Sequence, residues 1–234
     1  MKGTLYGIGV GPGDPELITR KAERLIRACP VAAVPGEEAG RSVAYRIAVQ
    51  VVPELAEKEL LAIPMPMSRD AARVEVFHAA GAARIAQVLE SGRDIAFLTI
   101  GDPTIYSTYM YLHRRIAEQG YPTDIVSGIP SFCAAAARLG ESLAERDQTL
   151  HIIPSSYPIA DALSLPGTKV LMKSGKKLGA VREVLLAHGG SVAMIENCGM
   201  EGERSFRGAE QIPEDAGYYT LLIVRDQGES DKGE

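Results

Sequence analysis

Short apolar runs alternate with helical patterns along the first half of this chain. Residues 4–10, 31–34, 60–63 and 95–100 have the composition of buried strands, and the segments between them repeat apolar residues at helical spacing. Alternation of this kind predicts a mainly parallel sheet that is covered by helices on both faces. Further strand and helix patterns follow residue 120. The expected fold class is therefore α/β, with two α/β domains that contain mainly parallel or mixed sheets.

The length of 234 residues is enough for two domains of modest size, each with its own core. The texture of the sequence changes where prolines and serines gather after the strand pattern at 150–153. We expect an N-terminal domain over residues 1–120 and a C-terminal domain over residues 121–226. Residues 227–234 form a polar tail that we expect to be disordered.

Composition and charge argue against several classes of function. The net charge is -5 and no stripe of Lys and Arg offsets it, which argues against nucleic-acid binding. Residues 94–112 contain two aspartates as well as Gly and Pro, so this apolar stretch is a poor membrane span. Three scattered cysteines without a CxxC pair favour a reducing, cytoplasmic location. The four histidines lack metal-ligand spacing, so no metal site is expected.

The first strand pattern ends in a glycine-rich turn, residues 7–13. A dinucleotide-binding GxGxxG does not fit there, because the last position would be Pro12 in one register and Asp14 in the other. A tight turn that needs glycine conformations is the alternative. Asp14 and Pro15 then predict the start of a helix that runs to Cys29.

A second polar turn, residues 101–108, follows the apolar run 95–100 and precedes a helical pattern that starts at Tyr109. It contains a Gly-Asp-Pro sequence and several hydroxyl groups. Open α/β sheets bind small molecules at the carboxyl ends of their strands. The sequence therefore places polar chemistry on a predicted binding edge.

Three segments together resemble the signatures of a known enzyme family. They are residues 7–19, 101–103 and 128–132, in that order, and residues 219–225 match a closing strand. The family is the tetrapyrrole (corrin/porphyrin) methyltransferases, and the resemblance covers nearly the whole chain. Within the family, residues 64–70 and 97–108 look most like the branch that methylates C-20 of precorrin-2 or cobalt-factor II.

The resemblance implies a two-domain protein, usually a homodimer, with S-adenosylmethionine in a cleft between the domains. The cofactor-binding residues that it implies are Pro12, Gly101, Asp102, Ile105, Tyr106, Pro130, Ser131, Phe132, Met172, Lys173, Cys198, Gly199 and Thr220. Two positions depart from the family pattern. Ser127 replaces a common Pro, and Pro130 replaces a Thr, so the contact at Pro130 is expected to use the backbone only.

The residue types in the second turn suit methyl transfer. Gly101 lets the backbone approach a ligand, and Asp102 is able to accept hydrogen bonds from an adenosine or amino group, or to serve only as a turn carboxylate. Tyr106 is the candidate catalytic residue, since its hydroxyl could help remove the C-20 proton; a packing role is the alternative. The acetate and propionate groups of the substrate predict a basic rim, with candidates Arg69, Arg73, Arg114, Lys173, Lys176 and Lys177.

The leading hypothesis is thus a C-20-methyltransferase of cobalamin (vitamin B12) biosynthesis that acts on precorrin-2 or cobalt-factor II. A sister enzyme that methylates another ring position, in uroporphyrinogen III or a later precorrin, is the nearest alternative. A protein or RNA methyltransferase is disfavoured by the acidic charge. A nucleotide-binding oxidoreductase and a noncatalytic tetrapyrrole carrier are the alternatives from other classes. The sequence leaves open whether the substrate contains cobalt.

Overall fold

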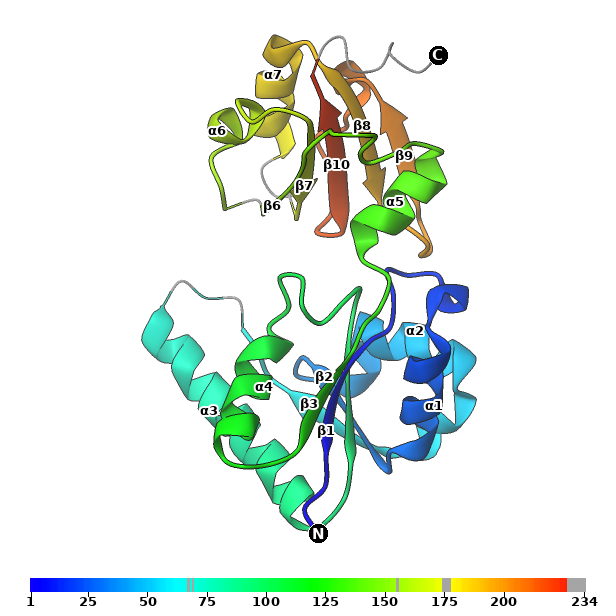
Figure 1. The fold of residues 1–234 in the computed structure, drawn as a ribbon, viewed down its shortest axis with the longest axis vertical. Coiled ribbons are helices and arrows are strands. Elements are labelled where there is room, and N and C mark those ends of the chain that lie inside the picture. Colours follow the sequence, from blue (N-terminus) through cyan, green and yellow to red (C-terminus); the bar gives the residue numbers. More distant parts are fainter. Residues whose placement is uncertain (67, 69, 155, 174–177, 227–234) are drawn as a thin grey trace. The chain divides into compact units, whose positions relative to one another are not determined.

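The structure is a computed structural model that describes residues 1–66, 68, 70–154, 156–173 and 178–226. The chain divides into two compact units, and the division falls between Pro130 and Ser131 (Figure 1). The sequence pattern had placed the boundary ten residues earlier, after residue 120. The later position has a simple reason: strand β5 pairs with β1 of the first sheet. The predicted tail, residues 227–234, lies outside the described residues.

The first unit contains one parallel sheet with the strand order β3-β2-β4-β1-β5, which confirms the predicted α/β class. Its strands in chain order are β1 Leu5–Gly9, β2 Val31–Pro35, β3 Glu59–Ile63, β4 Ile95–Thr99 and β5 Thr123–Val126. Its helices are α1 Arg20–Ala28, α2 Val43–Val51, α3 Ala71–Glu90 and α4 Tyr109–Glu118, with short 3-10 turns at Pro15–Leu17, Ala39–Arg41 and Pro53–Glu57.

The helices cover both faces of this sheet, as the alternating pattern predicts (Figure 1). Even-numbered residues of β1, such as Ile8, pack with α1 and α2, whereas Leu5 packs with α3 and α4. The helix that follows β1 therefore lies on one face, and the helix that follows β4 lies on the other. Since β1 and β4 are neighbours in the sheet, the chain diverges between them. Such a switch point is where open α/β sheets bind ligands.

The first helix begins later than the sequence pattern predicts. Asp14 caps a single 3-10 turn, Pro15–Leu17, by accepting the Glu16 N–H at 2.9 Å. Ile18 is then extended, and the hydroxyl of Thr19 accepts the Ala22 N–H at 3.2 Å. Because a threonine at this position is a good N-cap, a second start signal interrupts the predicted helix and α1 begins at Arg20.

The second unit contains a mixed sheet with the order β6-β7-β10-β8-β9, in which β6 and β7 are parallel and the other pairs are antiparallel. Its strands are β6 Leu150–Pro154, β7 Thr168–Met172, β8 Ser191–Glu196, β9 Arg204–Arg207 and β10 Thr220–Arg225. Its helices are α5 Ser131–Leu139, α6 Ile159–Leu163 and α7 Leu178–His188, with a 3-10 turn at Ala209–Gln211. Residues of α6 and α7 share one hydrophobic core with the sheet.

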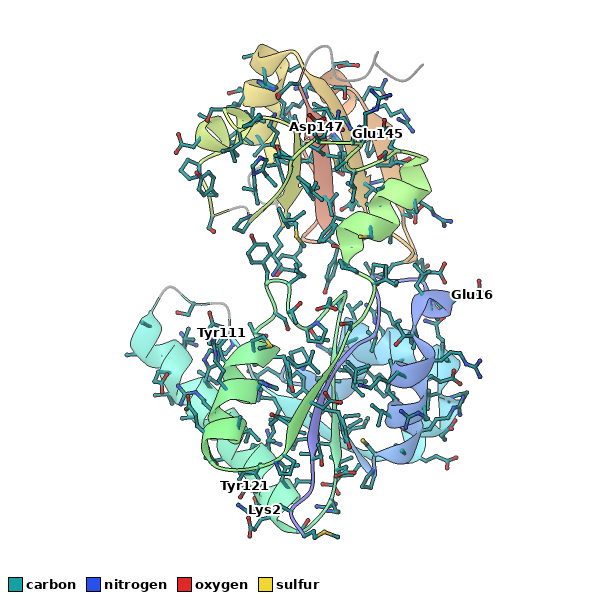
Figure 2. All side chains as sticks on the ribbon, in the orientation of Figure 1. Lys2, Glu16, Tyr111, Tyr121, Glu145 and Asp147 are labelled. Atoms are coloured by element: carbon teal, nitrogen blue, oxygen red, sulfur yellow. The ribbon has the colours of Figure 1, made fainter. Side chains whose placement is uncertain are left out.

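Side chains also tie the start of the chain to the first sheet. The Lys2 ammonium lies 4.2 Å from the centre of the Tyr121 ring (Figure 2), and the Tyr121 hydroxyl donates to Glu90 at the end of α3. These contacts hold the entry to β1 beside the entry to β5. Among the helices of the described residues, none has both the length and the apolar character that a bilayer crossing needs.

Candidate functional site

Three loops meet at the carboxyl ends of β4, β1 and β5, which are adjacent strands. Gly9, Gly101 and Gly128 bring the loop backbones into direct contact. A Cβ atom on Gly9 would lie 2.4 Å from the Gly101 carbonyl oxygen, and one on Gly128 would lie 2.2 Å from the same oxygen. Side chains at these two positions would prevent the approach. The three signature segments therefore contact one another at these three glycines.

The first two loops are also joined by backbone hydrogen bonds. The Gly101 N–H donates to the Gly11 carbonyl at 2.8 Å, and the Val10 N–H donates to the Thr99 carbonyl at 2.9 Å. Gly11 and Gly101 both have positive φ, 77° and 70°, a conformation that favours glycine. Pro12, one of the predicted cofactor-binding residues, follows directly and is buried.

Asp102 connects the second loop with the third. Its Oδ1 accepts the Thr104 N–H at 2.8 Å and the Thr104 hydroxyl at 2.6 Å, while its Oδ2 accepts the Gly128 N–H at 3.1 Å. The Ile105 N–H donates to the Asp102 carbonyl. This is a β-turn with Asp at its first position and Pro103 at its second, which are the residues that such turns favour. The side chain is only 7% exposed.

Tyr106 has a left-handed backbone, with φ of 47°, which is uncommon for a residue other than Gly, Asn or Asp. Its side chain is 45% exposed, whereas Ile105 is half-buried. The flanking residues hold this conformation: Ser107 Oγ lies 3.1 Å from Thr99 Oγ1 and accepts the Tyr109 N–H at 3.3 Å. Backbone strain of this kind persists only where the surroundings over-determine it, and it concentrates at functional sites.

The third loop ends at the boundary between the units. Ser127, the first departure from the family pattern, is exposed. Pro130, the second departure, is half-buried and is the last residue of the first unit. Ser131 and Phe132 belong to the second unit, where they open α5.

In the second unit, Met172 and Lys173 stand at the carboxyl end of β7, and both are half-buried. Lys173 has a left-handed backbone with φ of 62°, like Tyr106. Its ammonium lies 5.9 Å from the centre of the Tyr218 ring. Tyr106 and Lys173, both predicted site residues, thus combine a long side chain with a backbone conformation that costs energy.

Cys198 and Gly199 lie in a turn after β8 that the Glu203 carboxylate holds in place. The Gly199 N–H donates to Glu203 at 2.7 Å, and Glu203 also pairs with Arg138 of α5 at 2.9 Å. Burial alone would raise the pKa of the Glu203 carboxyl, but the Gly199 N–H and then Arg138 lower it further than burial raises it. The backbone N–H of Gly199 is therefore already used within the protein.

Thr220, at the start of β10, is 2% exposed, and its hydroxyl donates to the Gly217 carbonyl at 2.8 Å. Glu196, which pairs with Thr220 in the sheet, accepts the Gly217 N–H and bonds to Arg204. Because Glu196 precedes Cys198 by only two residues, this strand pairing places Thr220 close to the turn that contains Cys198 and Gly199.

Comparison with known proteins identifies the family. The model of the Tetrapyrrole (Corrin/Porphyrin) Methylases matches residues 4–212. This chain belongs to that family. The resemblance predicted from the three signature segments is therefore confirmed.

Individual relatives of this tetrapyrrole methylase are also informative. A cobalamin biosynthesis protein CobIJ from Mycobacterium bovis is 34% identical over 95% of this chain, and the chain spans about half, 46%, of the length of that relative. A cobalt-precorrin-2 C(20)-methyltransferase from Salmonella typhimurium is 32% identical over 98% of this chain and 99% of the relative.

A solved structure, that of a Thermus thermophilus uroporphyrin-III C-methyl transferase complexed with S-adenyl homocysteine, superposes with a TM-score of 0.72. It is 23% identical to this chain and covers 95% of this chain and 97% of its own. At this identity the likeness concerns the fold.

Only three of the six predicted basic-rim residues, Arg73, Arg114 and Lys173, lie among the residues that the structure describes. Arg73 lies on α3 with its guanidinium 6.0 Å from the centre of the Phe77 ring, and the guanidinium of Arg114, on α4, lies 5.4 Å from the centre of the Tyr111 ring. Both arginines are exposed. The predicted rim residues Arg69, Lys176 and Lys177 lie outside the described residues.

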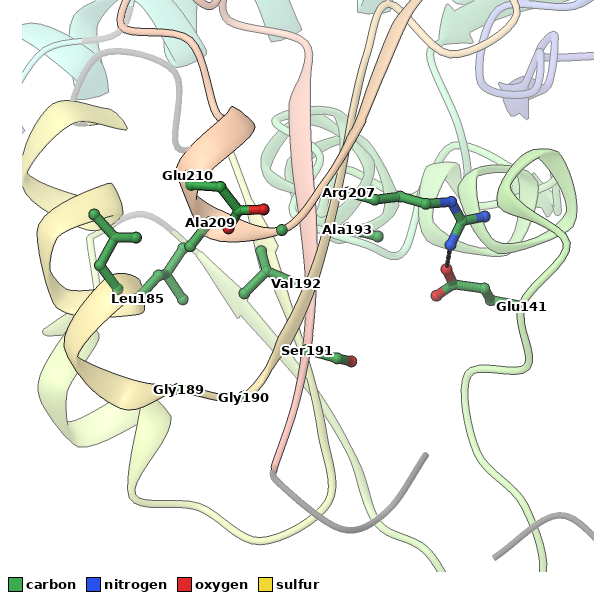
Figure 3. Close-up of a pocket in the computed structure, with 12 residues that line it drawn as sticks. Glu141, Leu185, Gly189, Gly190, Ser191, Val192, Ala193, Arg207, Ala209 and Glu210 are labelled. Carbon is green, nitrogen blue, oxygen red and sulfur yellow. Dashed lines mark hydrogen bonds and ion pairs between the residues drawn. The ribbon is translucent and has the colours of Figure 1, made fainter. Parts of the chain in front are cut away.

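A separate pocket of about 400 Å³ lies in the second unit (Figure 3). The end of α7, the start of β8 and the end of β9 form its walls, and Arg207 pairs there with Glu141. None of the predicted cofactor-binding residues lines it. Within the described part of the chain, no group of three or more His, Cys, Asp or Glu residues could hold a metal ion.

Sequence reasoning missed the residues that organise the loops. Thr99 and Glu196 are polar residues at the ends of apolar strand runs, and both are buried. Their position at the end of an apolar run is the feature that could have identified them, since a polar group at the end of a buried strand needs a hydrogen-bond partner. Nothing in the sequence indicated their partners, Ser107 and Gly217.

Proposed function

We propose that this chain is an S-adenosylmethionine-dependent methyltransferase of cobalamin biosynthesis, and that it methylates C-20 of precorrin-2 or its cobalt-bearing counterpart. The observation that carries the proposal is the match to the Salmonella typhimurium cobalt-precorrin-2 C(20)-methyltransferase, which extends over nearly the full length of both chains. The arrangement of the three signature loops at adjacent strand ends supports it, because that edge is the expected binding position.

The residues at this edge fit a cofactor that has no phosphate groups. A pyrophosphate binds to free N–H groups at a helix start. Here one amide at the start of the 3-10 turn, one in the first turn of α1 and one at the start of α4 already have side-chain partners: Asp14 accepts from Glu16, Thr19 from Ala22, and Ser107 from Tyr109. S-adenosylmethionine has a nucleoside and an amino acid but no phosphate, so it fits this edge better than a dinucleotide does.

Bound S-adenosylmethionine would supply an electrophilic methyl group on a sulfonium sulfur. The residues of this chain would orient the cofactor and keep water from it. Pro12, Gly101, Ile105 and Pro130 would form the backbone-rich surface in the first unit, and Tyr106 would face the substrate. The residues of the second unit, from Ser131 to Thr220, are proposed as contacts on the resemblance alone.

The C-20 carbon of the substrate is electron-rich, so this chemistry needs no strong nucleophile from the protein. It does need a group that helps the C-20 proton to leave after methylation. The exposed Tyr106 side chain is our candidate for this role, with water as the alternative.

The proposal is tested by incubating the purified protein with methyl-labelled S-adenosylmethionine and, separately, precorrin-2, cobalt-factor II and uroporphyrinogen III. A new methyl at C-20, located by NMR, is the expected result with one of the first two substrates. Methylation of uroporphyrinogen III, or at another ring position, would instead establish the sister activity. Binding of NAD but not of either sulfur ligand in a thermal-shift assay would favour the oxidoreductase alternative.

We also propose that the protein is a cytoplasmic homodimer. The family resemblance supports the dimer, and the absence of a disulfide among Cys29, Cys133 and Cys198, all within the described residues, suits a reducing compartment. Light scattering on the eluted protein would measure its mass, and a monomer would contradict the proposal.

A further inference from the structure

The Asp102 carboxylate is buried, and its hydrogen bonds are made within the protein. Three donors point at its two oxygens: the N–H and hydroxyl of Thr104, and the N–H of Gly128. An ionised carboxylate accepts hydrogen bonds and donates none, with about four lone-pair sites on its two oxygens. Three of these sites are therefore occupied before any ligand binds.

The partners of Asp102 belong to two different loops. Thr104 lies on the same turn, two residues before Tyr106, whereas Gly128 lies on the loop that follows β5. The bond to Gly128 spans 26 residues of chain and is buried. Charge-assisted hydrogen bonds of this kind are about twice as strong as neutral ones. Asp102 therefore fixes the distance between the second and third signature loops.

We propose that Asp102 is a positioning residue, with Thr104 as its partner, and that it acts on cofactor binding through the two loops rather than by touching the cofactor. This inference rests on the proposed function, because it names how the cofactor site of that function is held together. It favours the alternative of a turn carboxylate for Asp102 over direct acceptance of a hydrogen bond from an adenosine or amino group.

The first test compares Asp102→Asn, Thr104→Val and the double variant. An asparagine keeps the shape, but its NH2 group would face a donor on one side, so one of the two loops must be released. We expect Asp102→Asn to weaken S-adenosylhomocysteine binding about tenfold and Thr104→Val about threefold, and the double variant to be no weaker than Asp102→Asn, because residues in one hydrogen-bond network are not additive. Thr108→Val is the matched control, since this exposed threonine makes no side-chain cap bond.

Direct contact of Asp102 with the cofactor predicts a different pattern. Thr104→Val would then leave the affinity unchanged, while Asp102→Asn alone would lower it. That result would overturn the inference. Steady-state kinetics give a further readout: the KM for S-adenosylmethionine should rise while that for the tetrapyrrole stays within about twofold. An equal rise in both would contradict a role confined to the cofactor loops. If Asp102→Asn does not fold, Thr104→Val alone decides, because its side chain is exposed.

Failure of the proposed function would be recognised separately. If the wild-type chain binds neither S-adenosylmethionine nor S-adenosylhomocysteine, the function is wrong, whatever Asp102 does. Amide hydrogen exchange at residues 127–129 then still tests the positioning role without a ligand. We expect faster exchange at Gly128 in Asp102→Asn than in wild type, and unchanged exchange would overturn the inference.

Discussion

Gly7 and the buried ring of Tyr109 are so close that no side chain fits between them. A Cβ atom on Gly7 would lie 2.0 Å from Cε1 and 2.1 Å from Cζ of that ring. The ring is fully buried on the α4 side of the sheet, 5.2 Å from the centre of the Phe97 ring, and its hydroxyl lies 3.0 Å from Nδ1 of His113. Gly7, the first glycine of the glycine-rich turn, is therefore needed to let the Tyr109 ring pack against β1.

Replacing Gly7 with alanine should therefore destabilise the first unit. The added methyl must displace an aromatic ring that is packed on all sides, and overpacking of this kind costs about 1–3 kcal/mol. Urea unfolding measures the change in the free energy of unfolding. Gly40→Ala is the matched control, since no atom lies within 4 Å of its added Cβ; equal losses in both variants would contradict the packing role of Gly7.

Tyr106→Phe tests the catalytic candidate. Removing the hydroxyl should lower kcat by about 10- to 100-fold if this group helps the C-20 proton to leave, while S-adenosylhomocysteine affinity changes little. The measurement is single-turnover methylation alongside calorimetric titration. Tyr157→Phe, at another exposed tyrosine, is the control. Unchanged turnover in Tyr106→Phe would remove the hydroxyl from the mechanism and leave water as the proton acceptor.

Stability should fall at mildly acidic pH. Burial lowers the pKa of His78, and Arg115 lowers it further; burial and then Arg114 do the same for His113, although Glu75 and Asp124 act in the opposite direction on the two rings. The unfolded chain takes up these protons near its ordinary pKa of 6.5, while the folded state resists. The unfolded state then binds more protons than the folded state. The stability that the two neutral histidines contribute is therefore present above pH 6.5 and is lost as the pH falls below it.

Thermal unfolding between about pH 7.5 and 5.5 measures this effect. The double variant His78→Gln/His113→Gln should show a shallower pH dependence than wild type, whatever its absolute stability. Equal slopes would show that other groups dominate the acid response.

Glu203→Gln should loosen the turn that carries Cys198 and Gly199. The neutral side chain keeps a hydrogen-bond acceptor but loses the ionic part of its bond to Arg138 and the charge-assisted part of its bond to the Gly199 N–H. Hydrogen exchange at Gly199 should become faster, with Glu201→Gln, which is exposed in the same turn, as control. Unaltered exchange would mean that the turn keeps its conformation without the charge of Glu203.

Arg114→Gln tests the predicted basic rim. The change should raise the KM for the tetrapyrrole, and the difference from wild type should shrink as salt is added, because screening weakens exposed charge pairs. Arg20→Gln, at the exposed start of α1, is the control. A KM that responds neither to Arg114→Gln nor to salt would refute the rim.

The strands other than β9 were predictable because each is a short, mainly apolar run with clear breaks at its ends. The parallel first sheet followed from the alternation with helices. The edge strand β9 was not predicted: its residues alternate between half-buried and exposed and carry two arginines, so the apolar signal is weak. The short helix α6 lies among prolines and serines that favour loops.

The three signature loops were predicted to share one edge, but their direct contact was not. Contact depends on the order of the strands, and nothing in a single sequence places β4 between β1 and β2. The partners of Asp102 and Glu203 were unpredictable for the same reason. Gly128 is 26 residues away from Asp102, and Arg138 is 65 residues away from Glu203.

The position of β4 also has a consequence for how this chain acquires its fold. It is the fourth strand in sequence, yet it lies between the first two. During synthesis, β1 and β2 therefore emerge without the neighbour that joins them, and their edges stay open until residue 99 has left the ribosome. Long-range parallel pairing is slow, and open edges invite aggregation. We expect N-terminal fragments that end before β4 to aggregate, whereas fragments that extend beyond β5 can form the complete five-stranded sheet.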